Sequence, residues 1–440
     1  MNNMKKKLVL FASVAIALAS CQTTPKEDYS WIKKGLDVAS AQLQLTAEEI
    51  DGTGKLPRSI RTGYDMDFLC RQLERDPSTF QDSLRPQPTA EQMGKRRLCV
   101  VYDWTSGFFP GSLWYAYELT GNDTLKADAI QYTNLLNPVR YYKGTHDLGF
   151  MINCSYGNAE RLAPNDTIKA VMKETADNLS GRFNDSIGAI RSWDFGSWNF
   201  PVIIDNMMNL ELFTVASSMT GDNSYYNKAK SHADRTMINH FRPDGSSFHV
   251  VSYDTITGKV LNQVTHQGVG DQSAWSRGQA WGLYGFTMMY RQTGKKEYLD
   301  HAIKIGKYIM NHPRLPKDKI PYWDFDAPDI PKADRDASAG AIMASAYVEL
   351  STYVEGELCK QFLAIGEQQI KSLASPAYRA RKVGDNNHFI IKHCTGFMAK
   401  QYEIDAPLTY ADYYFVEALL RYKNLLEGRP VVETITAFSE

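Results

Sequence analysis

Thr-Gly pairs divide this chain of 440 residues into recurring helical hairpins. The pairs at 120–121, 220–221 and 293–294 each follow a segment whose apolar residues recur at helical spacing. In every copy an apolar residue lies four positions after the glycine and an alanine lies eight positions after it, which places both on one face of a following helix. A glycine just beyond a helix supplies the left-handed residue that satisfies the last carbonyl groups. Each copy is therefore predicted to be a helix, a tight turn and a second helix.

Further copies and one hairpin extend the pattern. A weaker copy follows Pro164, with Ile168 and Met172 at the same offsets, and Gly356 is a candidate for a fifth. Strand-like alternation is scarce outside residues 248–264, where a Thr-Gly pair favours a β-hairpin. Repeated helical hairpins form either an open solenoid or a closed, double-layered α/α barrel. Because the copies vary in length and carry long insertions, we favour the closed barrel, with all inner helices pointing the same way.

Composition indicates one large folded domain with no general attraction to nucleic acid. Hydrophobic residues make up 43% and charged residues 22% of the chain, which excludes a disordered or low-complexity protein. The 49 basic residues nearly balance the 50 acidic ones, so no broad positive field is expected and no nucleic-acid partner is predicted. No Pro- or Ser-rich linker divides residues 31–428, which we expect to form a single barrel domain followed by a tail over 429–440.

The amino-terminal residues are typical of a bacterial lipoprotein leader. Lys5–Lys7 precede the apolar stretch Leu8–Leu18, which is too short to span a membrane. The Leu-Ala-Ser-Cys ending resembles a lipobox, in which Cys21 becomes the lipidated first residue. We therefore expect a signal peptide over 1–20, a polar tether over 21–30, and an exported protein, periplasmic or outer-membrane associated, that meets the membrane only through this lipid. The alternative is an ordinary signal peptide that happens to contain a cysteine.

The remaining cysteines point to neither a disulfide framework nor a metal site. They are odd in number and widely scattered: Cys70, Cys99, Cys154, Cys359 and Cys394. None has the close cysteine or histidine spacing of a zinc site. We expect buried free thiols, with one disulfide possible, and we expect no metal and no other cofactor.

Polar and aromatic residues gather just before, or at the start of, the expected inner helices. If these helices all point the same way, their starts meet at one end of the barrel and the side chains converge on one pocket. A pocket lined by aromatic faces with a few charges is the default ligand site. The candidates are Trp104, His146, Asp147, Asp205, Arg277, Trp281, Asp336, Tyr410 and Asp412.

Two of these acids stand alone in apolar surroundings. Asp147 and Asp205 each lie at an expected helix start, where aspartate commonly caps the helix. The functional alternative is that the two carboxylates face each other across the pocket. Burial and like charge would then raise the pKa of one of them, whereas a helix N-terminus favours the anion. The sequence does not decide between these outcomes.

A second dense region runs from His249 to Trp281. Arg277 lies between two tryptophans there, and its planar fork suits a carboxylate, while an indole face suits a sugar ring. The same region holds the run Thr265–Gly268, which includes Gln267. Tryptophan at helical spacing is usually part of the core, and a lone histidine is more often structural than catalytic.

At these residues the sequence resembles the unsaturated glucuronyl hydrolases, glycoside hydrolase family 88. The similarity holds in order and spacing from about Leu56 to Tyr422. The matching stretches are Asp103–Gly111, His146–Phe150, Ile203–Leu210, Thr265–Gly268, Ser273–Trp281 and Tyr410–Tyr414. Each motif alone is modest, but six in order are specific.

The resemblance implies an all-α (α/α)6 barrel, with the hairpin near 248–264 as a short insertion. It implies a substrate oligosaccharide with a 4,5-unsaturated uronic acid at its non-reducing end, the product of a polysaccharide lyase, of glycosaminoglycan type. It also implies a reaction in which the ring vinyl ether is protonated at C4 and water adds at C5. The resulting hemiketal then opens with loss of the partner sugar.

Residue roles also follow from the resemblance. Asp205 corresponds to the general acid and base, and Asp147 to its partner near the ring hydroxyls. The implied uronate pocket is made by Trp104, His249, Gln267, Arg277 and Trp281. The polar segment Arg71–Arg97 does not align with the family pattern, so its part in an outer subsite stays open.

Three alternatives stay open at this point. The related unsaturated rhamnogalacturonyl hydrolases share the barrel, although the histidines and the Thr-His-Gln-Gly run favour the glucuronyl group. A conventional two-carboxylate glycosidase also needs an acid but attacks the anomeric carbon. A non-catalytic lipoprotein that binds glycans is the third, but a binder would not need Asp147 and Asp205 in one cleft.

Overall fold

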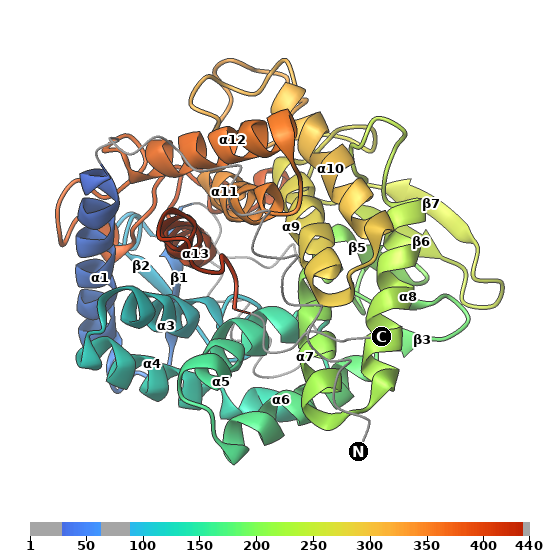
Figure 1. Cartoon of the computed structure of the whole chain (residues 1–440), viewed down its shortest axis with the longest axis horizontal. Helices are drawn as coiled ribbons and strands as arrows, with labels where there is room; N and C mark the ends of the chain where they lie inside the picture. The colour runs from blue at the N-terminus through green and yellow to red at the C-terminus, as the bar shows by residue number, and fades with distance from the viewer. Residues whose placement is uncertain (1–28, 63–88, 434–440) are drawn as a thin grey trace, which may run out of the picture.

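Six inner helices stand in a closed ring around the centre of the molecule (Figure 1). The computed structural model describes residues 29–62 and 89–433, and the count refers to these ranges. Each inner helix contacts the next one along the chain, and the last contacts the first, which closes the barrel. The inner elements are α3 (Phe108–Thr120), the π-helical η5 (Gly149–Gly157) continued by α5 (Asn158–Leu162), α7 (Leu210–Thr220), α9 (Ser276–Thr293), α11 (Ala337–Ser351) and α13 (Thr409–Leu426).

A second layer of helices surrounds this ring. Its members are α1 (Ser30–Ile50), α4 (Asp123–Leu135), α6 (Asp166–Ser180), α8 (Asn223–Asn239), α10 (Lys296–Asn311) and α12 (Gly356–Ala374). Helix α11 is buried along its whole length, whereas α10 buries only a stripe of residues at three- and four-residue spacing. The contrast identifies inner and outer layers, so the predicted (α/α)6 barrel is confirmed.

The Thr-Gly pairs close helices as the sequence predicts. Gly121, Gly221 and Gly294 follow α3, α7 and α9 in the left-handed conformation, and each donates its N–H to a carbonyl four residues back. The residues four and eight positions later are buried on the next helix. Gly356 behaves differently, because it begins α12 instead of closing α11, which ends at Ser351.

Short strands lie at the end of the barrel where the inner helices begin. β6 (Val250–Tyr253) and β7 (Val260–Val264) form the predicted antiparallel hairpin, with Val250 opposite Val264. β5 (Pro201–Ile203) pairs with the other edge of β6, which makes a three-stranded sheet. The remaining strands are β1 (Leu56–Ile60), β2 (Arg96–Cys99), β3 (Phe183–Asn184) and β4 (Ala189–Ile190), and the short helices are η4 (Asn137–Tyr141), η6 (Ile204–Asn209), η7 (Asn386–His388) and η8 (Met398–Lys400).

Some of the predictions fall outside the described residues. They are the signal peptide over 1–20, the lipidated Cys21, the tether up to residue 28, Cys70, residues 71–88 and the end of the tail after residue 433. Three cysteines, Cys99, Cys154 and Cys394, are buried free thiols as expected, whereas Cys359 is disulfide-bonded. No helix in the described ranges has both the length and the apolar character needed to cross a bilayer.

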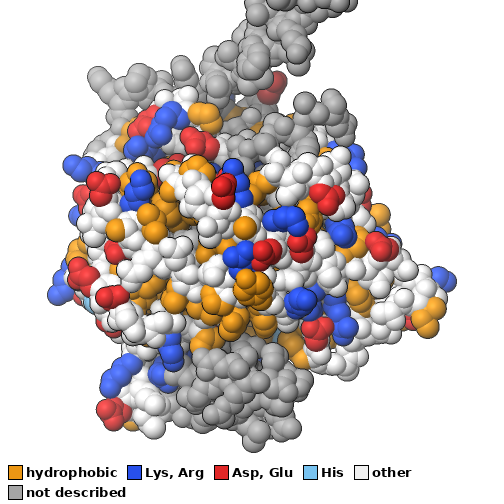
Figure 2. All heavy atoms as spheres, turned by 90° about the horizontal axis from the view of Figure 1, so that it is seen from below, with side chains coloured by type: hydrophobic (Ala, Val, Ile, Leu, Met, Phe, Trp, Pro, Cys, Tyr) orange, Lys and Arg blue, Asp and Glu red, His pale blue; other side chains and the backbone are white. Residues whose placement is uncertain are grey.

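The outer surface mixes charges of both signs. The face in Figure 2 shows basic and acidic side chains next to one another with apolar side chains between them. This mixture agrees with the near balance of 49 basic and 50 acidic residues.

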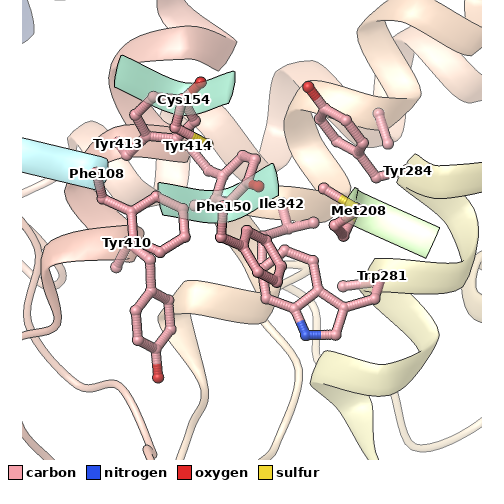
Figure 3. Close-up of a cluster of buried hydrophobic side chains, with 14 of the residues drawn as sticks. Phe108, Phe150, Cys154, Met208, Trp281, Tyr284, Ile342, Tyr410, Tyr413 and Tyr414 are labelled. Atoms are coloured by element: carbon pink, nitrogen blue, oxygen red, sulfur yellow. The ribbon is translucent and has the colours of Figure 1, made fainter. Parts of the chain in front are cut away.

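Aromatic side chains fill the centre of the ring (Figure 3). The Phe150 ring centroid lies 5.0 Å from that of Trp281, and Trp281 lies 5.5 Å from Tyr414. Phe108 lies 5.8 Å from Tyr410 on the other side of the cluster. The indole nitrogen of Trp281 and the hydroxyl of Tyr410 point to the same side of this layer (Figure 3). The layer therefore forms the floor of any pocket at the end where the inner helices begin.

Candidate active site

The starts of the inner helices bring most of the predicted residues together. Trp104, just before α3, lies 5.0 Å from Tyr410 of α13 and 5.5 Å from Phe150 of η5 by ring centroids. The guanidinium of Arg277, at the start of α9, lies 5.5 Å from the Tyr410 ring. Asp205 lies in η6, directly before α7. The candidate site is thus built from segments that are distant in sequence, as a barrel of parallel inner helices requires.

Asp205 faces His249 across a short gap. Nε2 of His249, directly before β6, lies 3.5 Å from Oδ1 of Asp205, and neither atom has another hydrogen-bond partner among the described residues. Nδ1 of His249 accepts the backbone N–H groups of His266 and Gln267, each at 3.1 Å. Because a backbone N–H can only donate, Nδ1 carries no proton, and neutral His249 carries its proton on Nε2, toward Asp205.

The surroundings of Asp205 favour its charged form. Burial is the largest influence and raises its pKa, but His249, His146 and Arg277 together outweigh it. The pKa of Asp205 therefore lies below its ordinary value, and Asp205 is a carboxylate in the free protein.

Asp147 shows the opposite shift. Its Oδ1 lies 3.3 Å from Nε2 of His146, and its Oδ2 accepts a hydrogen bond of 2.8 Å from the Thr145 hydroxyl. Burial raises the pKa of Asp147, and the negative charges of Asp205 and Asp103 raise it further, against the opposing influence of His146 and Thr145. The structure thus separates the two acids, a question that the sequence left open, and neither side chain makes an N-cap hydrogen bond to its helix.

Arg277 is held by the protein on both sides of its fork. Nη1 donates to Asp336 at 2.8 Å and to the Thr395 carbonyl, and Nη2 donates to Gln267 at 2.9 Å and to the Gly396 carbonyl. Its guanidinium also lies 4.6 Å from the Trp275 ring. With both Nη groups occupied, Arg277 supports Gln267 and the segment at 395–396, and only Nε lacks a partner.

Two other candidates serve the framework instead of the pocket. Asp336 caps α11 through the N–H groups of Ser338 and Ala339 while it binds Arg277. Asp412 accepts the N–H groups of Ile390 and Ile391, so its carboxylate is directed at that segment. Trp281 is fully buried in the floor, and Trp104 is partly buried above it.

Relatives of known activity share this architecture. An "Unsaturated glucuronyl hydrolase" of Formosa agariphila is 48% identical over 327 residues, which cover 74% of this chain and 81% of that protein. An "Unsaturated chondroitin disaccharide hydrolase" of Streptococcus pyogenes is 33% identical over 364 residues, which cover 81% of this chain and 90% of that one. The chain belongs to the unsaturated glucuronyl hydrolases. It is therefore a glycoside hydrolase.

Solved structures agree with this assignment. A crystal structure of an "unsaturated glucuronyl hydrolase specific for heparin" matches with a TM-score of 0.82 and 45% identity, over 91% of this chain and 99% of that one. The unsaturated glucuronyl hydrolase of Bacillus sp. GL1 matches with a TM-score of 0.77 and 26% identity, over 89% of this chain and 97% of that one. A separate sequence profile described as "Domain of unknown function" matches residues 4–75.

In this unsaturated glucuronyl hydrolase an aromatic rim borders the acids, and the sequence analysis missed it. Trp193 lies 5.9 Å from the His249 ring, 5.0 Å from the His266 ring and 5.0 Å from Phe195, on which it stacks. Trp198 lies 5.3 Å from Trp193. These residues belong to an irregular loop, where helix periodicity carries no signal; the only sequence sign is the density of aromatic residues around Gly196.

Residues 89–97 of the unaligned segment lie beside the site. They lead into β2, which pairs with β1, and Arg97 lies 2.7 Å from Glu403. Within residues 29–62 and 89–433, no group of three or more histidine, cysteine, aspartate or glutamate side chains is placed to hold a metal ion.

Proposed function

We propose that this hydrolase releases the 4,5-unsaturated uronic acid from lyase-generated oligosaccharides of glycosaminoglycan type. The observation that carries the proposal is the pair of neighbouring aspartates beside the aromatic side chains, whose environments move their pKa values in opposite directions. Such separation is typical of sites where two acids have different tasks. The names of the relatives, which specify heparin in one case and chondroitin disaccharides in another, support the substrate class.

In the proposed reaction Asp205 carries the proton in both directions. Binding of the substrate carboxylate adds negative charge and excludes water, and both effects favour the protonated form of Asp205. Asp205 gives this proton to C4 of the ring, and a water molecule adds to C5 and returns a proton to Asp205. The hemiketal formed at C5 then opens, the bond to the partner sugar breaks, and one water molecule has been consumed.

The rest of the pocket orients the sugar ring in this proposal. The faces of Trp104 and of the floor residue Trp281 supply apolar surface for the sugar ring. Gln267 and His249, which lie beside Asp205, bind the polar groups of the sugar. Arg277 fixes Gln267 through its 2.9 Å hydrogen bond, so it acts on the substrate through that residue. Trp193 and Phe195 extend the aromatic surface outward, where the partner sugar would lie.

The test is the Asp205→Asn variant, assayed by loss of the ultraviolet absorbance of the unsaturated ring in chondroitin-, hyaluronan-, heparin- and ulvan-derived disaccharides. The amide keeps the shape of the side chain but cannot deliver a proton, so we expect turnover to fall by about 10²–10⁴-fold with KM largely retained. In heavy water the native enzyme should place deuterium on the methylene group of the released keto acid.

Asp300→Asn, on the exposed face of α10, is the matched control and should keep full activity. The proposal is wrong if Asp205→Asn turns over like the native enzyme, or if no deuterium enters the product.

We also propose that the protein is exported and anchored by a lipid on Cys21, in the periplasm or on the outer membrane. Support comes from the basic and apolar residues before the Leu-Ala-Ser-Cys run and from the polar residues that follow it. This anchor would be its only contact with the membrane.

A further inference from the structure

The orientation of one asparagine fixes the proton on His146. Nδ2 of Asn206 donates to the Ile190 carbonyl and to the Ser192 hydroxyl, each at 2.9 Å. A carbonyl can only accept, so this end of the amide is the NH2 group, and the other end, Oδ1, faces Nδ1 of His146 in a very short contact. Two acceptors would repel at that separation, and therefore Nδ1 of His146 carries a proton.

A second asparagine near the same nitrogen does not change this assignment. Asn209 accepts the Phe150 N–H through Oδ1, so its Nδ2 is the end that lies 3.4 Å from Nδ1 of His146. At that length it is a weak competitor for the much shorter Asn206 contact.

The other ring nitrogen of His146, Nε2, faces the Asp147 carboxyl group. Nε2 lies 3.3 Å from Oδ1 of Asp147, and a neutral imidazole in this tautomer offers only a lone pair there. The Thr145 hydroxyl accepts the Asp147 N–H and donates to Oδ2, so it supplies no proton to Oδ1. A lone pair and a carboxylate oxygen attract only if a second proton lies between them, on either atom.

The other histidine–aspartate pair has the reverse arrangement. His249 uses Nδ1 as an acceptor for two backbone N–H groups, so its own Nε2 proton fills the gap to Asp205 and no additional proton is needed. The His249–Asp205 pair thus keeps one negative charge. The His146–Asp147 pair, with a proton shared between Nε2 and Oδ1, has a net charge of zero.

We propose that His146 is a positioning residue that holds a proton against Asp147, so that only one of the two neighbouring histidine–aspartate pairs is negative when the anionic substrate arrives. The inference rests on the proposed function, because it concerns how the same pocket receives a uronate. Neutrality of the His146–Asp147 pair reduces the negative charge that the substrate meets, and the shared proton fixes the direction in which the Asp147 carboxyl group faces the ring hydroxyls.

The titratable groups around the pair are few. Asp205 and Asp103 lie near Asp147 and favour its protonated form, and Tyr142 lies near enough to feel its charge. On the other side His232 lies near His146 and is neutral, because burial lowers its pKa to about 3. His146 itself is 1% exposed, so the imidazole side of the shared proton is shielded from solvent.

The test compares native enzyme with His146→Asn over a pH series. The variant removes the imidazole whose Nε2 lies 3.3 Å from Oδ1 of Asp147, and with it the group that holds the proton there. In the variant, the KM for an unsaturated disaccharide should begin to rise at a lower pH than in the native enzyme. At about pH 7.5 it should be about tenfold above the native KM, because the negative charges of Asp147 and of the substrate then repel each other. Toward acid pH the ratio should approach one, because burial raises the pKa of Asp147 and the acid protonates unaided.

Two further variants separate this role from damage to the fold. His301→Asn removes another buried imidazole, which belongs to α10 and packs against Phe241 and Phe286, and should leave the pH profile unchanged. In His146→Asn/Asp147→Asn no group titrates at these positions, so the excess rise of KM with pH should disappear. A KM ratio that is the same at every pH means a merely structural role and overturns the proposal.

Nitrogen NMR of the histidine side chains shows which ring nitrogens of His146 carry a proton, and it needs no substrate turnover. The His146 signals, identified by their loss in His146→Asn, should show Nδ1 protonated across the neutral range. A neutral ring with a bare Nδ1 would overturn the inference. Since this measurement needs no substrate, it separates failure of the proton assignment from failure of the proposed function, which the ultraviolet assay of the native enzyme reports.

Discussion

Glu403 is a buried anion whose partners come from separate segments of the chain. Its carboxylate accepts from Arg58 of β1 at 2.9 Å and lies 2.7 Å from Arg97 of β2. Its backbone carbonyl accepts the N–H of Gly396, next to the carbonyl that binds Arg277. Burial alone would raise the pKa of Glu403, but the two arginines outweigh it and lower the pKa to about 2. The residue links the two strands to the segment that supports the pocket.

Glu403→Gln should therefore destabilise the protein in a pH-dependent way. A carboxyl whose folded pKa is depressed stabilises the folded state above its unfolded pKa of about 4.5, and the stabilisation is lost as pH falls toward 2. At neutral pH the variant leaves two buried arginines short of counter-charge, and we expect a loss of about 3–5 kcal/mol in the free energy of unfolding. Urea unfolding across this pH range should show the difference from native shrink as pH falls.

Glu357→Gln, on the exposed start of α12, is the control for loss of a surface carboxylate and should change little. A difference between native and Glu403→Gln that stays constant from neutral to acid pH would contradict the assigned ion pairs.

At the residue scale, sequence reasoning placed the acids but not the partners of Arg277. Asp147 and Asp205 were found because each precedes an inner helix, and helix starts can be located from periodicity. The partners of Arg277 include carbonyl groups 118 and 119 residues further along the chain. A backbone carbonyl has no residue-specific signature, so nothing in the sequence indicates that this arginine is occupied by the protein.

At the scale of elements, the glycines that close the inner helices act through backbone conformation alone. Gly294 follows α9 with φ of 67°, and an added Cβ would have no neighbour within 4 Å. Gly294→Ala should lower the free energy of unfolding by about 1 kcal/mol, because the left-handed conformation is unfavourable for a residue with a Cβ. Gly35→Ala, in the middle of α1, is the matched control.

A methyl group at Gly35 would lie at ordinary contact distance, 3.8 Å from Leu419 and 3.9 Å from Phe415. Because alanine favours a helix over glycine, this variant should stabilise the protein by up to about 1 kcal/mol. Chemical denaturation of both variants checks the pair. Equal effects of the same sign would exclude conformation as the cause.

Periodicity predicted the hairpins but not the winding of every inner helix. The segment Gly149–Gly157 is π-helical, and its carbonyls lie so close to α3 that a Cβ at Gly107 would be 2.2 Å from the Phe150 oxygen. Apolar spacing of three and four residues does not reveal such a local widening. The β-hairpin after His249 was predicted, whereas its pairing with β5 joins segments that are separated by α8 and was not.

At the scale of the whole molecule, the two ends of the barrel differ in what they carry. The inner helices begin at the pocket, whereas α1 begins near the ends of α3 and α13, at the opposite end of the barrel. Tyr29 there lines a groove of about 760 Å³ together with Thr120 at the end of α3 and Leu426 at the end of α13. The proposed catalytic residues and Tyr29 are therefore separated by the length of the barrel.

This arrangement sets the orientation of the enzyme if Cys21 carries the lipid. The eight residue-to-residue steps from Cys21 to Tyr29 would span at most about 29 Å if fully extended. An inner helix of 18 residues such as α13 adds about 27 Å between that end and the pocket. We expect the pocket to face away from the membrane, where soluble oligosaccharides from a lyase can enter without meeting the bilayer.

Fluorophores at the two ends test this orientation. Asp123→Cys places a label beside the end of α3, and Gln401→Cys places one on an exposed residue at the pocket end. In vesicles that contain a quenching lipid, the first label should be quenched and the second should not. Cys21→Ala should abolish both membrane binding and quenching, which separates the anchor from the orientation. Binding with equal quenching at both ends would leave the anchor in place but exclude the outward-facing pocket.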